Sequence, residues 1–294
     1  MKHRIFLISL VFLLCGSFAH AQQKPLPQPP IIGAKSYVLI DGNTGATLAS
    51  LKPDERLAPA SLTKLMTAYA VFHALADNQI ALGDQVTVSE KAWRTQGSRM
   101  FIEVGTQVSV EELILGMIVQ SGNDASVALA EHVAGTETVF AQLMNQYAAQ
   151  LGMSGSSFRN SSGMPDQDHY TTARDMATLA RAIINEFPQY YRWYSVKEYE
   201  YNGIKQPNRN SLLWRDESVD GMKTGRTDEA GYCLVSSAQR DDMRVISVVL
   251  GTSSAKSRID GSQALLNYGF RFFETRLLYR AGETVATALS LIHI

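Results

Sequence analysis

The sequence predicts an α+β fold in which helices flank an antiparallel sheet and also form a helical subdomain. Near the N-terminus, alternating residues from Ser36 to Ile40 precede the turn-forming segment Asp41-Gly42-Asn43-Thr44-Gly45, a pattern that predicts a strand hairpin. The middle of the chain has apolar residues at helical spacing. Short β-rich runs return after Tyr199. This order of strands, helices and strands predicts one antiparallel sheet covered by helices on both faces.

The individual elements follow from the same patterns. After the first strand, Ala46 to Leu51 completes the hairpin, and Ser61 to Leu75 is predicted to be a helix with a broad apolar face. Further helices are expected at Val110 to Val119, Ala125 to Val133, Phe140 to Leu151 and Met176 to Asn185, the last with Thr172 and Asp175 as a capping pair. The later strands are expected at Val219 to Lys223, Tyr232 to Ala238 and Arg244 to Leu250, followed by an amphipathic helix that contains Leu265, Leu266, Phe270 and Phe273.

The two ends of the chain differ in composition from the middle. Residues 1–21 have a basic start, an apolar run from Ile5 to Cys15 and the small-residue site Ala19-His20-Ala21, so a secretory signal peptide and export are predicted. Residues 22–30 form a proline-rich leader, and residues 31–275 suit one large domain. Residues 276–288 are interpreted as the start of a truncated β-rich domain. Residues 289–294 resemble a translated sequencing adaptor and are expected to be artefactual.

Charge, cysteine and histidine content exclude several kinds of partner. The formal net charge is -1 with no block of like charge, which argues against nucleic acid. Only Cys233 follows the signal peptide, so no intrachain disulfide is expected, and a buried core thiol is predicted. His73, His132 and His169 lack metal-ligand spacing. We therefore predict no metal and no cofactor.

Three short motifs carry the chemistry: Ser61-Leu62-Thr63-Lys64, Ser121-Gly122-Asn123 and Lys223-Thr224-Gly225. A serine and a lysine three residues apart share one face of a helix, so Lys64 can reach the Ser61 hydroxyl. A lysine acts as a base only if burial and cationic neighbours lower its pKa, and Lys223 is the candidate neighbour. Together the motifs resemble the signature of the serine penicillin-recognising enzymes.

The flanking residues narrow this resemblance. Pro59-Ala60 before the first motif, Asp124-Ala125 after the second and Asp220-Gly221-Met222 before the third are similar to the low-molecular-mass penicillin-binding proteins of the serine D-alanyl-D-alanine carboxypeptidase family. The resemblance extends from about Ile31 to about Thr275. It implies a β-lactamase/transpeptidase-like fold and an enzyme that removes the terminal D-alanine from peptidoglycan stem pentapeptides through an acyl-enzyme. It also implies acylation by β-lactam antibiotics.

The resemblance assigns roles to five residues beyond the serine–lysine pair. Ser121 relays a proton toward the leaving amine. Asn123 bonds the substrate amide and steadies Lys64, a task that suits a side chain able to donate and accept. Lys223 and Thr224 hold the terminal carboxylate, and Gly225 is expected to leave room for the substrate backbone.

Two arginines complete the implied site. Backbone N–H groups of Ser61 and Arg226 would form an oxyanion hole. Arg226 stands where carboxypeptidases of this type often have histidine, a departure that bears on the pH profile. Arg258 resembles the family arginine that helps to hold the carboxylate, although a surface arginine is the alternative interpretation.

Three other functions share these motifs. A class A β-lactamase needs a Glu-x-x-x-Asn segment, and Glu198 with Asn202 has that spacing, but within a strand-like run. A D,D-endopeptidase would differ only in the group that lies beyond the scissile bond, and a penicillin-binding sensor would acylate without turnover. The resemblance implies a periplasmic enzyme at the outer face of the inner membrane, held there in the full-length protein by a C-terminal amphipathic helix.

Overall fold

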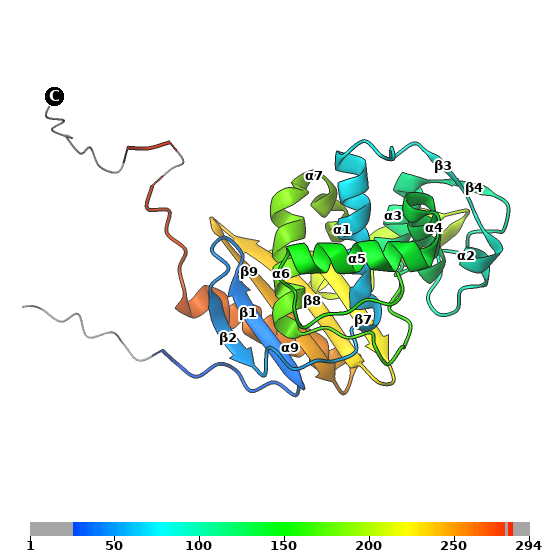
Figure 1. Ribbon diagram of the computed structural model, residues 1–294. Helices are drawn as coiled ribbons and strands as arrows, with labels where there is room; N and C mark the ends of the chain where they lie inside the picture. The colour runs from blue at the N-terminus through cyan, green and yellow to red at the C-terminus, as the bar shows by residue number, and fades with distance from the viewer. Residues whose placement is uncertain (1–25, 280–281, 285–294) are drawn as a thin grey trace, which may run out of the picture.

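The computed structural model describes residues 26–279 and 282–284, and its centre is a five-stranded antiparallel sheet (Figure 1). The strand order is β2-β1-β9-β8-β7, which leaves β7 at an edge. The bounds are Ser36–Asp41 for β1, Thr47–Leu51 for β2, Val219–Thr227 for β7, Gly231–Arg240 for β8 and Met243–Thr252 for β9. The predicted hairpin and the three later strands are confirmed, and each later strand is longer than predicted.

Helices cover both faces of this sheet, as predicted. Helix α9 (Ala255–Phe272) packs on one face, and helix α6 (Ala173–Glu186) packs on the other (Figure 1). Because side chains alternate along a strand, Val38 joins the hydrophobic cluster on the side of α6 and Leu39 joins the cluster on the side of α9. The sheet therefore separates two hydrophobic clusters.

The helical region lies beyond α6. Helices α1 (Thr63–Ala76), α3 (Val110–Val119), α4 (Asn123–Ala134) and α5 (Glu137–Gln150) agree with the predicted helices to within three residues. Several short elements were not predicted, since three to five residues give no measurable periodicity. They are β3 (Gln85–Thr87), α2 (Glu90–Arg94), β4 (Gln107–Ser109), α7 (Pro188–Tyr191), η2 (Arg192–Ser195), β6 (Ile204–Pro207) and α8 (Leu212–Arg215).

The start of α6 corrects one prediction. The helix begins at Ala173 rather than Met176, because the Thr172 side chain accepts a hydrogen bond from the Asp175 N–H at 3.1 Å. The Asp175 carboxylate does not complete a reciprocal cap and instead accepts from the Gly155 N–H at 3.0 Å. It thus ties a loop to the helix.

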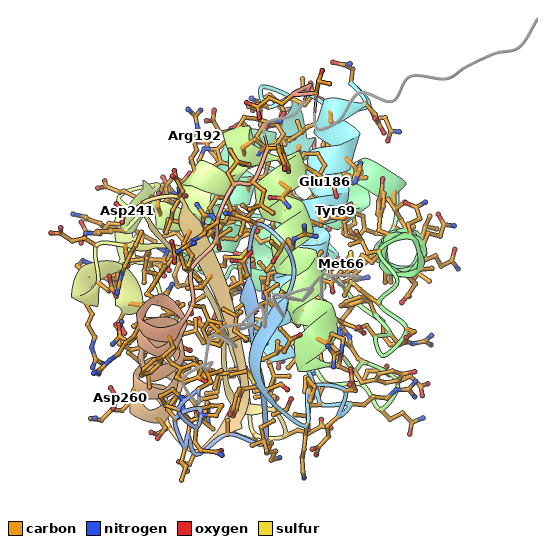
Figure 2. The ribbon with its side chains drawn as sticks, turned by 90° about the vertical axis from the view of Figure 1, so that its left-hand side faces the viewer. Met66, Tyr69, Glu186, Arg192, Asp241 and Asp260 are labelled. Carbon is orange, nitrogen blue, oxygen red and sulfur yellow. The ribbon has the colours of Figure 1, made fainter. Side chains whose placement is uncertain are left out.

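Helices α1 and α6 are joined by a polar contact near one end of the molecule. The Tyr69 hydroxyl on α1 donates to the Glu186 carboxylate on α6 at 2.8 Å, and Figure 2 shows the two side chains close together. Met66, one turn earlier on α1, is fully buried in the cluster on this side of the sheet. This contact fixes the middle of α1, the helix that carries Lys64 in its first turn.

Several terminal predictions fall outside the described residues. They are the signal peptide, the tail at 289–294 and most of the strand expected from Ala281 to Ala288. The described part of the leader has no regular secondary structure, and Pro27 accepts a hydrogen bond from the Tyr268 hydroxyl at 2.9 Å. Among the described residues, none of the helices combines the length and apolar character needed to cross a bilayer. Cys233 is fully buried, which confirms the predicted core thiol.

Candidate active site

The nucleophile sits on a tight turn that packs against the edge strand. Ser61 belongs to the 3₁₀ helix η1 (Ala60–Leu62), which precedes α1, rather than to the α-helix predicted from the sequence. Ala60 has a left-handed φ of +47°, a conformation that non-glycine residues rarely adopt and that often marks functional sites. A Cβ on Gly225 of β7 would lie 3.0 Å from the Pro59 carbonyl oxygen. Gly225 therefore admits the nucleophile turn, and because it also lines the cavity, its role in leaving room for the substrate backbone stays a prediction.

Lys64 lies buried beneath Ser61 and is positioned to act on it. Its Nζ is 3.0 Å from the Ser61 Oγ and donates to the Asn123 Oδ1 at 2.6 Å and to the Ser162 carbonyl oxygen at 2.7 Å. A neutral amine has two N–H bonds and one lone pair. The two carbonyl acceptors can take the N–H bonds, and the lone pair then points to the serine hydroxyl.

The environment of Lys64 favours this neutral form. Burial lowers its pKa to about 7, Asp124 opposes the shift, and the positive charge of Arg209 adds to it. Arg209 was not expected from the sequence, and it acts in addition to the predicted neighbour Lys223, whose ammonium group and that of Lys64 repel each other. A lysine with a pKa near neutrality can serve as a general base.

The second motif reaches the cavity from the junction of α3 and α4. Ser121 has a left-handed φ of +62° and lines the cavity. Asn123 begins α4, and it is held on both sides: its Nδ2 donates to the Gln96 carbonyl at 2.6 Å and its N–H donates to the Ser98 carbonyl at 2.7 Å. The amide is therefore oriented with its oxygen toward Lys64.

The third motif presents β7 to the cavity. Lys223 is 2% exposed, its Nζ donates to the Thr224 carbonyl at 3.1 Å, and burial followed by repulsion from Lys64 holds its pKa well below the usual value. Thr224 and Arg226 line the cavity. The Arg226 guanidinium lies 5.5 Å from the centre of the Tyr232 ring. As an edge strand, β7 also offers unpaired backbone groups to a substrate.

Arg258 and a second arginine lie at the same end of the cavity. The Arg258 Nη1 donates to the Gly225 carbonyl at 3.1 Å, so the structure places this residue at the third motif. Arg209 was not predicted. It is exposed between two buried asparagines, one of which, Asn210, donates to the Gly221 carbonyl at 3.0 Å. The sequence Asn208-Arg209-Asn210 is typical of a loop, and nothing in it indicates that the segment lies over the cavity.

The wall of the cavity opposite β7 was also not predicted from the sequence. The Thr67 hydroxyl donates to the Ser161 carbonyl at 2.6 Å, which draws residues 161–163 onto α1. Gly163 has a φ of +87°, and a Cβ there would collide with the Ala60 carbonyl. Nearby, Thr63 bonds the His169 Nε2 at 2.8 Å, and burial lowers the pKa of that histidine to about 4. This wall supplies the Ser162 carbonyl that bonds Lys64.

These parts enclose a cavity of about 530 Å³. Seven of the nine predicted site residues line it, and Lys64 and Lys223 lie buried behind them. The lining residues are Ser61, Gly97, Ser98, Ser121, Asn123, Ser162, Gly163, Met164, Arg209, Thr224, Gly225, Arg226, Thr227, Tyr232 and Arg258. They include three arginines and no carboxylate, so the cavity suits an anionic ligand.

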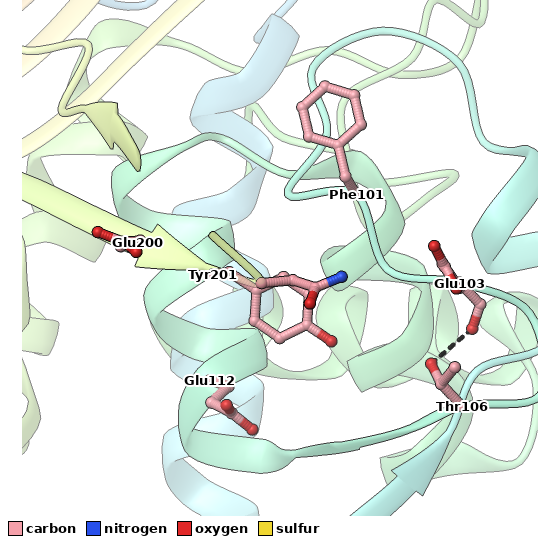
Figure 3. Close-up of a pocket in the computed structure, with 7 residues that line it drawn as sticks. Phe101, Glu103, Thr106, Glu112, Glu200 and Tyr201 are labelled. Carbon is pink, nitrogen blue, oxygen red and sulfur yellow. Dashed lines mark hydrogen bonds between the residues drawn. The ribbon is translucent and has the colours of Figure 1, made fainter. Parts of the chain in front are cut away.

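Two other features lie apart from this cavity. A pocket lined by Glu103, Glu112, Glu200 and neighbouring residues contains none of the predicted site residues (Figure 3). Glu198 lies in strand β5 (Glu198–Tyr201), pairs with Lys205 at 2.5 Å and does not line the cavity. The described residues contain no group of three or more histidine, cysteine, aspartate or glutamate side chains able to hold a metal ion.

The fold and the site define a serine hydrolase in which a buried lysine takes the place of the usual histidine base. The family model described as D-alanyl-D-alanine carboxypeptidase matches residues 22–254. The chain is 48% identical over 286 residues to the D-alanyl-D-alanine carboxypeptidase DacC of Escherichia coli, which covers 95% of this chain and 71% of the relative. The chain therefore belongs to the D-alanyl-D-alanine carboxypeptidase family of serine peptidases.

Solved structures agree with this assignment. The crystal structures of penicillin binding protein 5 from Haemophilus influenzae match with a TM-score of 0.81 and 48% identity, over 83% of this chain and 72% of that protein. A penicillin-binding protein from Listeria monocytogenes, in its ampicillin-bound form, matches with a TM-score of 0.77 and 30% identity, over 83% of this chain and all of that protein. The predicted β-lactamase/transpeptidase-like fold is thereby confirmed.

Proposed function

We propose that this protein removes the terminal D-alanine from peptidoglycan stem pentapeptides through an acyl-enzyme on Ser61. The observation that carries the proposal is the placement of the Lys64 Nζ, 3.0 Å from the Ser61 Oγ and bonded to two carbonyl oxygens. With its pKa lowered to about 7, this amine can take the proton of the serine hydroxyl near neutral pH.

The arrangement of Ser61 and Lys64 allows acylation of the serine by the substrate. The Ser61 Oγ attacks the carbonyl carbon of the penultimate D-alanine while Lys64 takes the hydroxyl proton. Backbone N–H groups of Ser61 and Arg226 stabilise the oxyanion, and each such donor contributes roughly a hundredfold or more in rate. The C–N bond then breaks, and the proton reaches the leaving amine through Ser121. D-alanine departs and an ester on Ser61 is left.

Deacylation completes the cycle. A water molecule attacks the ester carbonyl, its hydroxide part joins the carbonyl carbon, and its proton returns to the Ser61 Oγ. The products are the shortened stem peptide, with a new carboxylate, and the free enzyme. No cofactor takes part in either step.

Binding of the substrate carboxylate explains the charge of the cavity. Thr224 and Arg258 line the cavity and Lys223 lies buried behind Thr224, which supports a role for these three residues in binding the terminal carboxylate. No lining residue carries a negative charge that would compete for the cations. A β-lactam carries a carboxylate beside a reactive amide and would acylate Ser61 in the same way. The ampicillin-bound Listeria relative supports this second class of ligand.

The substrate implies where the enzyme works. Peptidoglycan lies outside the inner membrane, so we propose that the N-terminal signal sequence exports the protein to the periplasm. In the full-length protein, a C-terminal amphipathic helix would hold the catalytic domain at the outer face of the inner membrane. Fractionation of cells that express the full-length protein, with and without its last helix, tests both parts of this proposal.

The function is tested by turnover of diacetyl-lysyl-D-alanyl-D-alanine with wild type and Ser61→Ala. Release of D-alanine and labelling by a fluorescent penicillin should both vanish in the variant. Labelling without release in wild type would instead indicate a sensor, and rapid release of hydrolysed penicillin would indicate a β-lactamase. Amidation of the peptide C-terminus should abolish turnover by a carboxypeptidase, whereas an endopeptidase would tolerate it.

A further inference from the structure

A second cavity, of about 620 Å³, adjoins the active-site cavity and shares Arg209 and Arg258 with it. Its other walls come from the short helix α8, which contributes Arg215, and from the first turn and a half of α9, which contributes Lys256 and Asp260. The Asp260 label in Figure 2 marks this part of α9. The two shared arginines therefore stand at the boundary between the catalytic cavity and a second space.

The second cavity has a surplus of positive charge. Four cationic side chains line it against one carboxylate, Asp260, which pairs with both Arg215 (2.6 Å) and Lys256. Arg209 has neither a hydrogen bond nor an ion pair with another residue in the part of the chain that the structure describes, although the anchored segment 208–210 holds it at the boundary. The Arg258 Nε is buried and also unpaired among these residues. A ligand with a second negative charge would satisfy both arginines.

We propose that this second cavity is a subsite for an additional carboxylate in the leaving group. The inference rests on the proposed function, in which the terminal carboxylate of the leaving residue lies beside Arg258. The side chain of that residue then projects from the boundary formed by Arg209 and Arg258. D-alanine has only a methyl group there and brings no charge to the other cations of the cavity, Arg209, Arg215 and Lys256. An acidic D-amino acid, or the carboxylate-bearing stem released from a cross-linked peptide, would place its extra charge in the cavity.

The test compares tripeptides that differ only in the charge of the leaving residue. The substrates are diacetyl-lysyl-D-alanyl-D-glutamate and its isosteric neutral analogue, diacetyl-lysyl-D-alanyl-D-glutamine. The ratio of their kcat/KM values should favour the acidic peptide by roughly fivefold to tenfold at low ionic strength, and it should fall as salt is raised, because the cations are partly exposed. A ratio of one or below would overturn the proposal.

Matched variants assign the effect to the cavity. Lys256→Gln and Arg215→Gln should each lower the ratio about twofold to fivefold, and Asp260→Asn should raise it, because it removes the competing carboxylate. Lys197→Gln, an exposed lysine that lines neither cavity, should leave it unchanged. Both substrates are assayed with the same enzyme preparation. A partly unfolded fraction of a variant therefore lowers both kcat/KM values equally and leaves their ratio unchanged. Equal responses in the control and in the cavity variants would overturn the assignment.

A third substrate separates the two sources of the carboxylate. A cross-linked dimer of stem peptides should also lose kcat/KM in Lys256→Gln if the released stem occupies the cavity. A response confined to the D-glutamate peptide would assign the subsite to acidic D-amino acids alone. Failure of wild type to cleave any of these peptides, D-alanyl-D-alanine included, would reject the proposed function. Cleavage with no charge preference rejects only the subsite.

Discussion

The two faces of the central sheet bury different chemistry. On the face that packs against α6 and the helical region, the cluster continues into buried polar side chains, among them Lys64, Asn123 and Asp124. On the face that packs against α9, the buried residues are chiefly aliphatic, such as Leu234 and Leu265. One face therefore contains the catalytic groups, and the other stabilises the sheet that supports them.

This difference shows what burial does in each place. Burying an aliphatic side chain stabilises the fold by roughly 1.5–3 kcal/mol. Burying an ammonium group opposes folding unless it is paired or neutral, and here that cost appears as the lowered pKa of Lys64. The face that packs against α6 and the helical region is therefore less stable than a wholly apolar face would be, but it contains a reactive amine. Substitutions on the two faces should separate turnover from stability.

The largest effect on turnover, after loss of the nucleophile, is expected for Lys64→Gln. The amide is similar in length but cannot accept the serine proton, so the rate of acylation should fall by about 10²–10⁴-fold. Stopped-flow measurement of acylation by a fluorescent penicillin checks this. The variant should unfold at a temperature equal to or above that of wild type, because a buried titratable group has been replaced by a neutral one. Retention of more than a tenth of the acylation rate would contradict the role of Lys64 as base.

The pH dependence of acylation should show the next largest effect. Protonated Lys64 cannot accept a proton, and its pKa is about 7. Between about pH 5 and the pKa, the acylation rate should therefore rise about tenfold per pH unit, and it should then level off. Burial and repulsion from Lys64 lower the pKa of Lys223, so its charge is lost at a lower pH than that of an ordinary lysine, and binding of the substrate carboxylate should weaken with that loss. A flat profile below neutral pH would show that another group is the base.

The parts of the fold that could be predicted depend on local patterns. The hairpin of β1 and β2 follows from alternation and a turn of aspartate, glycine and asparagine, which act within a few residues. The helix starting near Ser61 was predicted, but the 3₁₀ turn was not, because it forms where Ala60 is held by β7 and the wall at Gly163. Contacts between segments that are far apart in the sequence leave no periodic pattern in the sequence from which they could be predicted.

The same distinction applies to the site. Ser61, Asn123 and Lys223 stand in short motifs, and the resemblance to a known family identified them without geometry. Arg209 and the Ser162 carbonyl are in no motif. Arg209 is placed by neighbouring asparagines that bond other strands and loops. The Ser162 carbonyl is a backbone group that any residue type at this position would provide. Only the folded chain shows that both act on Lys64.

A smaller effect on turnover is expected for Arg209→Gln. The substitution removes a cation that lies near Lys64 and at the mouth of the cavity, so KM for the D-alanyl-D-alanine peptide should rise by about two- to tenfold. The pKa seen in the acylation profile should move upward, because less positive charge opposes protonation of Lys64. Arg192→Gln, on an exposed arginine of η2, is the control. If KM changes but the pH profile of acylation does not shift, Arg209 contributes to substrate binding and not to the lowered pKa of Lys64.

The smallest effect on turnover, with a large effect on stability, is expected for Leu265→Ala. This side chain is fully buried between α9 and the sheet, so its truncation should lower the free energy of unfolding by about 2–5 kcal/mol. The rate of acylation by penicillin should change less than about twofold in the folded enzyme, because Arg258, the predicted site residue on α9, lies about two turns away from Leu265. Denaturant unfolding together with penicillin acylation measures both, and Arg271→Ala, exposed on the same helix, should change stability by less than about 0.5 kcal/mol. A loss of acylation as large as that of Lys64→Gln would show that the two faces are coupled, and the division between a catalytic and a supporting face would then be wrong.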